Sequence, residues 1–168
     1  MRTYSVRRLD VAVPWVSDFR QRYEAAVPRV PEEELEALIH REASWEEIIQ
    51  LIDSVTPHGF MLFMANEAHP VFRRAGDRAV CFWYLMGNHT IAERMYRHDP
   101  RAMLYAPLRT VIWQNETGAA WFSVDQPSTH FAGLGSPEVT RVGVELDRKL
   151  AALLGFLGTD VPEELLQS

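Results

Sequence analysis

The residues of this chain best suited to acid–base chemistry are its histidines, because an imidazole titrates at about pH 6.5 and can also ligate metals. The six are His40, His58, His69, His89, His98 and His130. His89 is the first candidate for a catalytic base, since Asn88 is a good N-cap and would place the His89 ring in the first turn of a helix. A helix N-terminus favours the neutral imidazole, which is the form that accepts a proton. His69, in a loop beside a strand end, is the second candidate base.

Neither a metal nor a cofactor is expected on the pattern of ligand-forming residues. His89 and Glu93 would share one helix face, but one histidine and one glutamate are too few to hold a metal. A hydrogen bond on the helix surface is the simpler interpretation of that pair. Cys81 is the only cysteine, so the chain has no cysteine metal cage and no intramolecular disulfide. A glycine-rich phosphate loop is also absent from the sequence.

Asp125, Ser128 and His130 have the residue types of a hydrolase triad, but they lie too close together in sequence. Members of a triad converge from separate elements, and the glycines of a nucleophile elbow do not flank Ser128. We interpret Ser128 as the N-cap of a short turn that reaches Leu134. Asp125 and His130 remain candidates for binding a substrate.

Arg109 lies among apolar residues of a predicted strand, on the same side as Val111 and Trp113. An arginine in such a place needs a carboxylate partner or an anionic ligand. Asp125 on the neighbouring predicted strand is the obvious partner, so a structural ion pair is the favoured interpretation. The alternative is that Arg109 anchors the carboxylate of a ligand.

Aromatic residues gather on the same predicted strands. Such residues are usually part of a core, but on a second apolar face they can form a dimer interface or a pocket wall. We therefore predict a pocket between the sheet and its helices, walled by Trp113 and Trp121. The complete set of predicted substrate-binding residues is Asn88, Arg109, Trp113, Trp121, Asp125 and His130.

The elements that must position these side chains follow from apolar spacing, caps and turn residues. Helices are expected at residues 15–26, 32–41, 44–55, 89–98 and from 137 to Gly155 or Gly158. Strands are expected at residues 3–13, 60–64, 80–86, 108–115 and 119–125, the last two joined by a hairpin turn. Residues 66–76 form a connection with room for one helical turn around Val71 and Phe72, and residues 159–168 form a polar tail.

Strands mixed with helices around a central hairpin predict an α+β fold. We expect a two-layer sandwich with a mainly antiparallel sheet covered by helices, in a single domain of residues 1–168 with a helical insertion at 14–43. The strand at 80–86 is apolar on both faces, whereas an antiparallel sheet with one wet face alternates apolar and polar residues. Cover on both faces is therefore expected, from helices, from a partner subunit, or from both.

The composition excludes several classes of function. The chain has 168 residues, a net charge of −6 and a hydrophobic fraction of 47%, which is usual for a globular domain. Its basic clusters, such as Arg73–Arg74, are too small for a nucleic-acid-binding face. No apolar run approaches the ~18 residues of a membrane span, and the first ten residues lack the apolar core of a secretory signal. We predict a cytoplasmic protein that binds neither nucleic acid nor membrane.

Several short motifs, taken together, give the chain a resemblance to a known family. They are Gly87-Asn88-His89 with Ile91-Ala92, Asp99-Pro100, Leu104 to Arg109, Asp125 to Ser128, and Leu146 to Leu150. This set resembles the domain of unknown function 302 family over residues 44–156, in a branch with a longer N-terminus. Leu108 stands where many members carry a cysteine, so thiol chemistry does not carry over, and His89 replaces a proline. The resemblance implies a compact α+β fold, a homodimer and no settled activity.

Three hypotheses about function follow. The first is a small-molecule-binding protein or cofactor-independent enzyme that acts on an apolar or aromatic substrate. In that case His89 or His69 is the base, Arg109 orients an acidic group, and Trp113 and Trp121 are walls. The second is a protein that binds haem non-covalently through one histidine. The third is a dimeric interaction module without catalytic activity.

Overall fold

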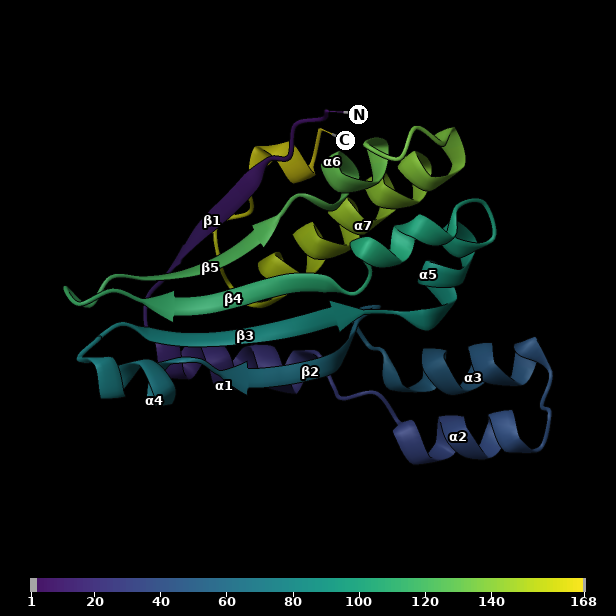
Figure 1. The fold of residues 1–168 in the computed structure, drawn as a ribbon, viewed down its shortest axis with the longest axis horizontal. Coiled ribbons are helices and arrows are strands. Elements are labelled where there is room, and N and C mark those ends of the chain that lie inside the picture. Colours follow the sequence, from purple (N-terminus) through teal and green to yellow (C-terminus); the bar gives the residue numbers. More distant parts are fainter. Residues whose placement is uncertain (1–2, 168) are drawn as a thin grey trace.

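The structure is a computed structural model that describes residues 3–167. Its centre is one antiparallel sheet of five strands in the order β1-β5-β4-β3-β2. The strands are β1 (Arg8–Val13), β2 (Met61–Glu67), β3 (Val80–Gly87), β4 (Leu108–Gln114) and β5 (Ala120–Asp125). Helices pack on this sheet, so the predicted α+β class is confirmed (Figure 1).

The central strands bury every second residue, because successive side chains of a strand point to opposite faces. In β4, Leu108, Thr110 and Ile112 are buried, whereas Arg109 is exposed. β4 and β5 form the predicted hairpin, whose turn places Gly118 at a φ of 93°. Glycine adopts this left-handed conformation without a steric cost.

One face of the sheet is covered by α1 (Val16–Ala26) and α7 (Pro137–Phe156). In α1, Phe19 and Tyr23 are fully buried and both rings contact the ring of Phe122 on β5. α7 contributes the predicted apolar stripe, and it ends shortly before Gly158, whose φ is 74°. Nη1 of Arg22 donates a hydrogen bond of 2.6 Å to the Leu157 carbonyl, which joins the two helices.

Two short segments close the end of the sheet where β3 ends and β4 begins. They are α5 (His89–Tyr96) and the 3-10 helix η2 (Pro100–Leu104), and they pack against each other. α6 (Pro127–Ala132) follows β5 and packs on α7. A Cβ on Gly143 would lie 3.0 Å from Cα of Ser128, so a glycine is what allows α6 to approach α7 this closely.

The remaining helical segments lie at the margins. α2 (Glu32–His40) buries none of its residues, and α3 (Trp45–Val55) begins with the predicted capping box of Ser44 and Glu47. In Figure 1 these two helices stand beside the sheet rather than over it. α4 (His69–Phe72) and the 3-10 helix η1 (Arg73–Ala75) form the connection between β2 and β3, and the 3-10 helix η3 (Glu163–Leu165) lies near the end of the chain.

The second face of the sheet has no helix over it, as the view in Figure 1 shows. The side chains on this outer face include Trp83, Val111, Trp113 and Trp121, which are half-buried by one another and by their strand neighbours. Helices of this chain therefore cover one face only, and cover of the second face by a partner subunit stays a prediction. The apolar residues on β3 that motivated it are present on both faces, as predicted.

Four local predictions differ from the structure. β1 begins at Arg8 rather than at residue 3. The helix expected at residues 89–98 ends at Tyr96, and a 3-10 helix that was not expected, η2, follows it. The N-cap of α6 is Gln126 rather than Ser128. The C-terminal segment is more than a polar tail, because Leu165 is fully buried in the core. Between residues 3 and 167, no helix has the length and apolar character needed to cross a membrane.

Candidate functional site

An apolar cavity of about 250 Å³ lies between the end of β3, α5, α6 and α7. We call it the His89 cavity. Its walls are formed mainly by Phe60, Phe63, Ile91, Met95, Phe131 and Leu146, together with Met103 and residues 106–108. His89 is its only titratable lining residue. A cavity with apolar walls and one titratable group has the character of a small-molecule site, and its volume lies below that of pockets for drug-sized ligands.

Local chain geometry places His89 in the wall of this cavity. Asn88 caps α5, its Oδ1 accepting hydrogen bonds from the Thr90 and Ile91 amides at 2.8 and 3.4 Å, as predicted for an N-cap. Gly87, just before it, lets Pro107 approach closely, because a Cβ at Gly87 would lie 3.2 Å from the Pro107 Cβ. The turn at Gly87 therefore brings the start of α5 against the segment that leads into β4.

The His89 imidazole is held in an apolar environment. Its ring centroid lies 4.8 Å from that of Phe63, and burial lowers the pKa of His89 from its usual value. Nδ1 of His89 is buried and has no hydrogen-bond partner among the described residues. A buried polar atom without a partner is uncommon in proteins and calls for a specific explanation. His89 thus presents a neutral ring with one unused nitrogen.

Asn88, predicted to bind substrate, has its side chain engaged within the protein. Besides capping α5 through Oδ1, it donates from Nδ2 to the Gly59 carbonyl at 3.1 Å. Asn88 is buried and lines the cavity, but both ends of its amide are used. Its observed contacts fix α5 and the turn before β2 in place.

Arg109, Asp125 and His130 meet in a second hollow, on the opposite side of residues 103–108 from the His89 cavity. We call it the Arg109 cleft; its volume is about 380 Å³, and Leu85, Leu104 and Tyr105 also line it. It opens on the outer face of the sheet. Met103, Ala106, Pro107 and Leu108 line both hollows, so one segment separates them.

The predicted ion pair between Arg109 and Asp125 is not formed. Asp125 lies opposite Arg8 in the β1–β5 register and pairs with Arg8, and it also contacts Nε2 of His130 at 3.2 Å. The Arg109 guanidinium instead lies over the Trp83 ring, 5.1 Å from its centroid. The physical reason is that a carboxylate in a central strand has a neighbour on either side, and here the neighbour on β1 is the partner.

The charges in the Arg109 cleft are set by these contacts. Burial alone would raise the pKa of Asp125, but hydrogen bonds from Arg8 and His130 outweigh it and lower that pKa. Tyr105 stacks on the His130 ring with centroids 4.5 Å apart, and its hydroxyl is hydrogen-bonded to that of Tyr4. Nδ1 of His130 is the second buried nitrogen without a partner in the described chain.

Trp113 and Trp121 lie on the outer face, away from both hollows. They stand opposite each other in the hairpin and stack with centroids 4.4 Å apart, while Nε1 of Trp113 donates to the Ser123 hydroxyl at 2.8 Å. Trp113 lies four positions along the strand from Arg109, which is about 13 Å. The structure therefore does not place these tryptophans as walls of a pocket that contains His89 or Arg109.

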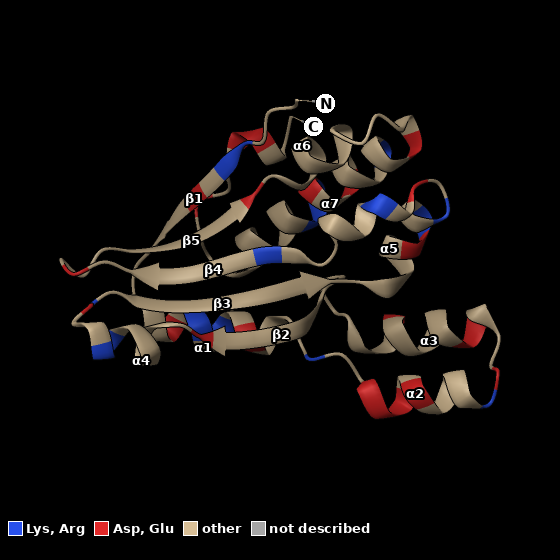
Figure 2. Ribbon diagram, in the orientation of Figure 1, with Lys and Arg blue, Asp and Glu red and all other residues tan. Residues whose placement is uncertain are grey.

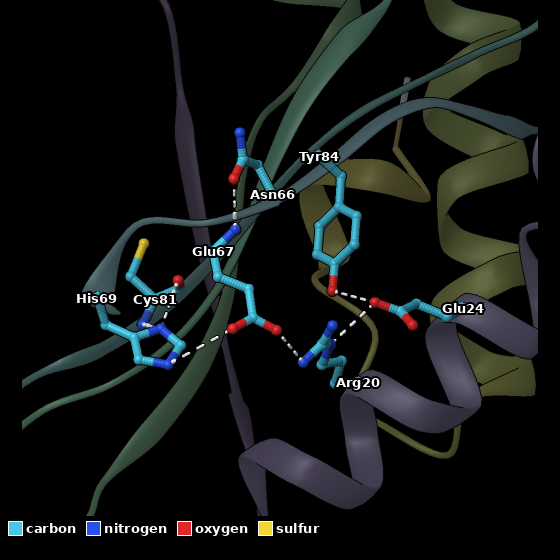
Figure 3. Close-up of polar contacts among 7 residues, drawn as sticks. All are labelled: Arg20, Glu24, Asn66, Glu67, His69, Cys81 and Tyr84. Carbon is cyan, nitrogen blue, oxygen red and sulfur yellow. Dashed lines mark hydrogen bonds and ion pairs between the residues drawn. The ribbon is translucent and has the colours of Figure 1, made fainter. Parts of the chain in front are cut away.

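His69 lies in a polar network at the far end of β2 and β3, which Figure 3 shows. Its Nδ1 is 3.1 Å from the Cys81 carbonyl, and its Nε2 is 3.9 Å from Glu67. Glu67 in turn accepts from Arg20 at 2.8 Å, so the network attaches α1 to the edge of the sheet. His69 is buried, and it lines neither the His89 cavity nor the Arg109 cleft.

The same network continues into the core through two further groups. Arg20 also bonds Glu24 at 2.9 Å, and Glu24 accepts a hydrogen bond of 2.8 Å from the buried Tyr84 hydroxyl. Burial and this hydrogen bond raise the pKa of Tyr84. Burial also raises the pKa of the nearby Cys81 thiol, which keeps it in its less reactive protonated form. These groups stabilise the attachment of α1 and show no arrangement for catalysis.

A larger hollow of about 620 Å³ lies between α5 and α7, but it is lined by paired charges. Arg94 bonds Glu145 at 2.8 Å, and Arg141 reaches Glu138 at 3.5 Å. Paired surface charges of this kind contribute little to stability. Within residues 3–167, no group of three or more histidine, cysteine, aspartate or glutamate side chains is arranged to hold a metal ion.

Sequence reasoning missed several residues that shape these sites. Met95, Met103 and Phe131 line the His89 cavity but look like ordinary core residues in the sequence. Asp147 is fully buried and accepts hydrogen bonds from Gln126 at 2.7 Å and from the Ser128 amide at 2.9 Å. An aspartate within the apolar stripe of α7 was the signal for this contact. These hydrogen bonds of Asp147 join two of the motifs on which the family resemblance rests, Asp125 to Ser128 and Leu146 to Leu150.

Comparison with known proteins agrees with the fold. A family model, "Domain of unknown function DUF302", matches residues 41–157. The crystal structure of an uncharacterised conserved DUF302 protein from Bacillus stearothermophilus superposes with a TM-score of 0.61 and 14% identity. The superposition covers 89% of this chain and 95% of that one, and at this identity it supports the fold alone. No curated protein matches the sequence. The family match spans well over half of the chain, which therefore belongs to the DUF302 family.

Proposed function

We propose that this protein binds a small apolar or aromatic molecule in the His89 cavity, with His89 as the group that contacts the polar atom of the ligand. The observation that carries this proposal is the partnerless, buried Nδ1 of His89, a residue that lines a cavity whose other lining residues do not titrate. A ligand hydroxyl or carbonyl would supply the missing hydrogen bond. Its apolar body would be held by Phe63, Met95 and Phe131.

The state of His89 defines what the cavity can do chemically. Because burial lowers its pKa, the ring is neutral at physiological pH and can accept a proton from a bound hydroxyl. That is the property of a general base, so a cofactor-independent proton transfer is within the chemistry of the site. Binding comes first in this scheme, and turnover depends on a ligand with an acidic proton.

The volume of the His89 cavity argues against haem as its ligand. At about 250 Å³ the His89 cavity lies below the range of pockets that bury drug-sized ligands, and a porphyrin is larger than many of those. The cavity therefore suits a single-ring or short-chain molecule rather than haem. The Arg109 cleft, at about 380 Å³, is lined by charged side chains and opens to the outer face.

The test is a titration with p-cresol, an aromatic ring with one hydroxyl, followed by NMR of methionine methyl groups. We expect saturable shifts at Met95 and Met103, which line the cavity, and not at the exposed Met64 on β2. Ala92→Phe places a ring in the cavity and should abolish the shifts, whereas Ala37→Phe on the exposed surface of α2 should leave them unchanged.

A second comparison isolates the role of His89. His89→Ala should weaken p-cresol binding by about fivefold, the equivalent of one hydrogen bond of about 1 kcal/mol, and leave toluene binding unchanged. Equal binding of p-cresol to the parent protein and to Ala92→Phe would overturn the proposed site. Equal losses for p-cresol and toluene in His89→Ala would overturn the role of His89.

A further inference from the structure

The outer face of the sheet holds a cation, Arg109, that has no anionic partner within residues 3–167. Across β1, β5 and β4 the sheet register sets Arg8, Asp125 and Arg109 in one row, because Arg8 lies opposite Asp125 and Thr110 lies opposite Val124. Two arginines thus flank a single carboxylate. Asp125 bonds Arg8 and His130, and Arg109 makes no ion pair or hydrogen bond with the described residues.

The Arg109 guanidinium is positioned rather than free in solvent. It lies over the Trp83 ring at 5.1 Å, an attraction between a cation and the electron-rich face of an aromatic ring. This contact uses none of the N–H donors of the guanidinium in a hydrogen bond. These donors form the planar fork that binds a carboxylate through two parallel hydrogen bonds.

The walls around Arg109 are apolar and aromatic. Leu85 and Leu104 line the cleft, and Tyr105 forms a further wall that is fixed by stacking on His130. Asp125, the one carboxylate among the lining residues, is paired with Arg8 and contacts His130 rather than Arg109. In Figure 2, β3 carries no charge and β4 a single basic position, whereas β1 and β5 carry acidic positions.

From this arrangement we infer a second ligand site, in which the Arg109 cleft binds the carboxylate of a small aromatic or apolar acid. Arg109 contacts the carboxylate, and Leu85, Leu104 and Tyr105 contact the apolar part. His130 and Arg8 hold Asp125, so that its negative charge does not oppose the incoming acid. This site lies on the other side of residues 103–108 from the His89 cavity. Evidence for or against ligand binding in the His89 cavity does not decide whether this second site exists.

The experiment compares three probes by amide NMR: sodium benzoate, benzyl alcohol and inorganic phosphate. Benzoate should give saturable shifts at Leu85, Tyr105 and Arg109. Benzyl alcohol has the same ring without the charge, and phosphate has charge without the ring, so both should bind this cleft at least tenfold more weakly. Phosphate that binds as tightly as benzoate would overturn the assignment to apolar acids.

Variants test the contact itself. Arg109→Gln should weaken benzoate binding at least tenfold, and Arg74→Gln, an exposed arginine outside the cleft, should leave it unchanged. Leu104→Asp adds a like charge at the cleft and should also weaken binding; Leu104 is 73% exposed, so the fold tolerates the change. Benzoate shifts that are absent, or that persist unchanged in both cleft variants, would overturn the inference.

Discussion

His89 illustrates how one buried ring makes stability depend on pH. Its folded-state pKa lies below the value of about 6.5 expected in the unfolded chain, so the unfolded state takes up the proton more readily. The free energy of unfolding should therefore be highest above about pH 6.5 and fall as the pH drops through the folded-state pKa. Urea unfolding of the parent protein and of His89→Gln at a series of pH values measures this contribution.

On acidification, the free energy of unfolding of the parent protein should fall more steeply than that of His89→Gln, because the glutamine variant lacks the titrating group. His40→Gln is the matched control, since His40 is exposed at the end of α2. It should follow the parent protein at every pH. A His89→Gln variant whose pH dependence equals that of the parent protein would contradict the assigned neutral state of His89.

Asp147 is the residue on which the joint between α6 and α7 depends. It is fully buried and accepts from Nε2 of Gln126 and from the Ser128 amide. Asp147→Ala would leave both donors without this acceptor and should lower the free energy of unfolding by about 3 kcal/mol. Chemical denaturation measures the change. Asp160→Ala, at an exposed position, should stay within about 0.5 kcal/mol of the parent protein.

At the scale of single residues, the sequence indicates which groups are unusual but not always with whom they pair. The prediction that Asn88 caps a helix is confirmed, because a cap is a local contact within a few residues. Arg109 and Asp125 do lie in adjacent strands, but Arg8 lies on the other side of Asp125 and pairs with it. The choice between two cross-strand arginines depends on the order of strands in the sheet, which spacing along the chain does not encode.

At the scale of elements, the close contact between α6 and α7 depends on a glycine. Gly143→Ala would set a Cβ 3.0 Å from backbone Cα of Ser128, and we expect a loss of about 1–3 kcal/mol of unfolding free energy as α6 shifts. Gly155 is in the same helix, but its added Cβ would meet only Val161 at 3.7 Å.

Gly155→Ala is therefore the matched control for the packing of α6. Alanine favours the helix over glycine by up to about 1 kcal/mol, and without a clash this variant should be as stable as the parent protein or more stable. Thermal unfolding of the two variants side by side checks both statements. A Gly143→Ala variant that gains stability as Gly155→Ala does would contradict the close packing of the two helices.

The elements that were predicted correctly are those with a strong local pattern. α3 shows both the capping box and the apolar face that its sequence indicated, and α7 keeps its apolar stripe over its whole length. η2 was missed because its sequence between Asp99 and Pro107 has two prolines and no apolar period. The burial of Leu165 was missed because a single apolar residue in a polar segment carries no pattern. Both cases depend on tertiary contacts.

At the scale of the whole molecule, the homodimer expected from the sequence remains a prediction, and the outer face of the sheet is where it would form. Val111, Trp113 and Trp121 lie there without a covering helix. Light scattering after size exclusion should give twice the mass of one chain, and Val111→Lys should shift the mass toward that of one chain. Thr117→Lys, in the exposed hairpin turn, is the control and should not. A parent protein with the mass of a single chain would contradict the prediction.

The segment from Met103 to Leu108 lies between the His89 cavity and the Arg109 cleft. A ligand that displaces this segment from one side narrows the hollow on the other side. For the two proposed sites we expect antagonistic binding: p-cresol in the His89 cavity should raise the benzoate concentration needed to fill the Arg109 cleft, and by thermodynamic reciprocity benzoate should do the same to p-cresol. Through residues 103–108, ligand binding inside the protein would in this way affect ligand binding at its outer face.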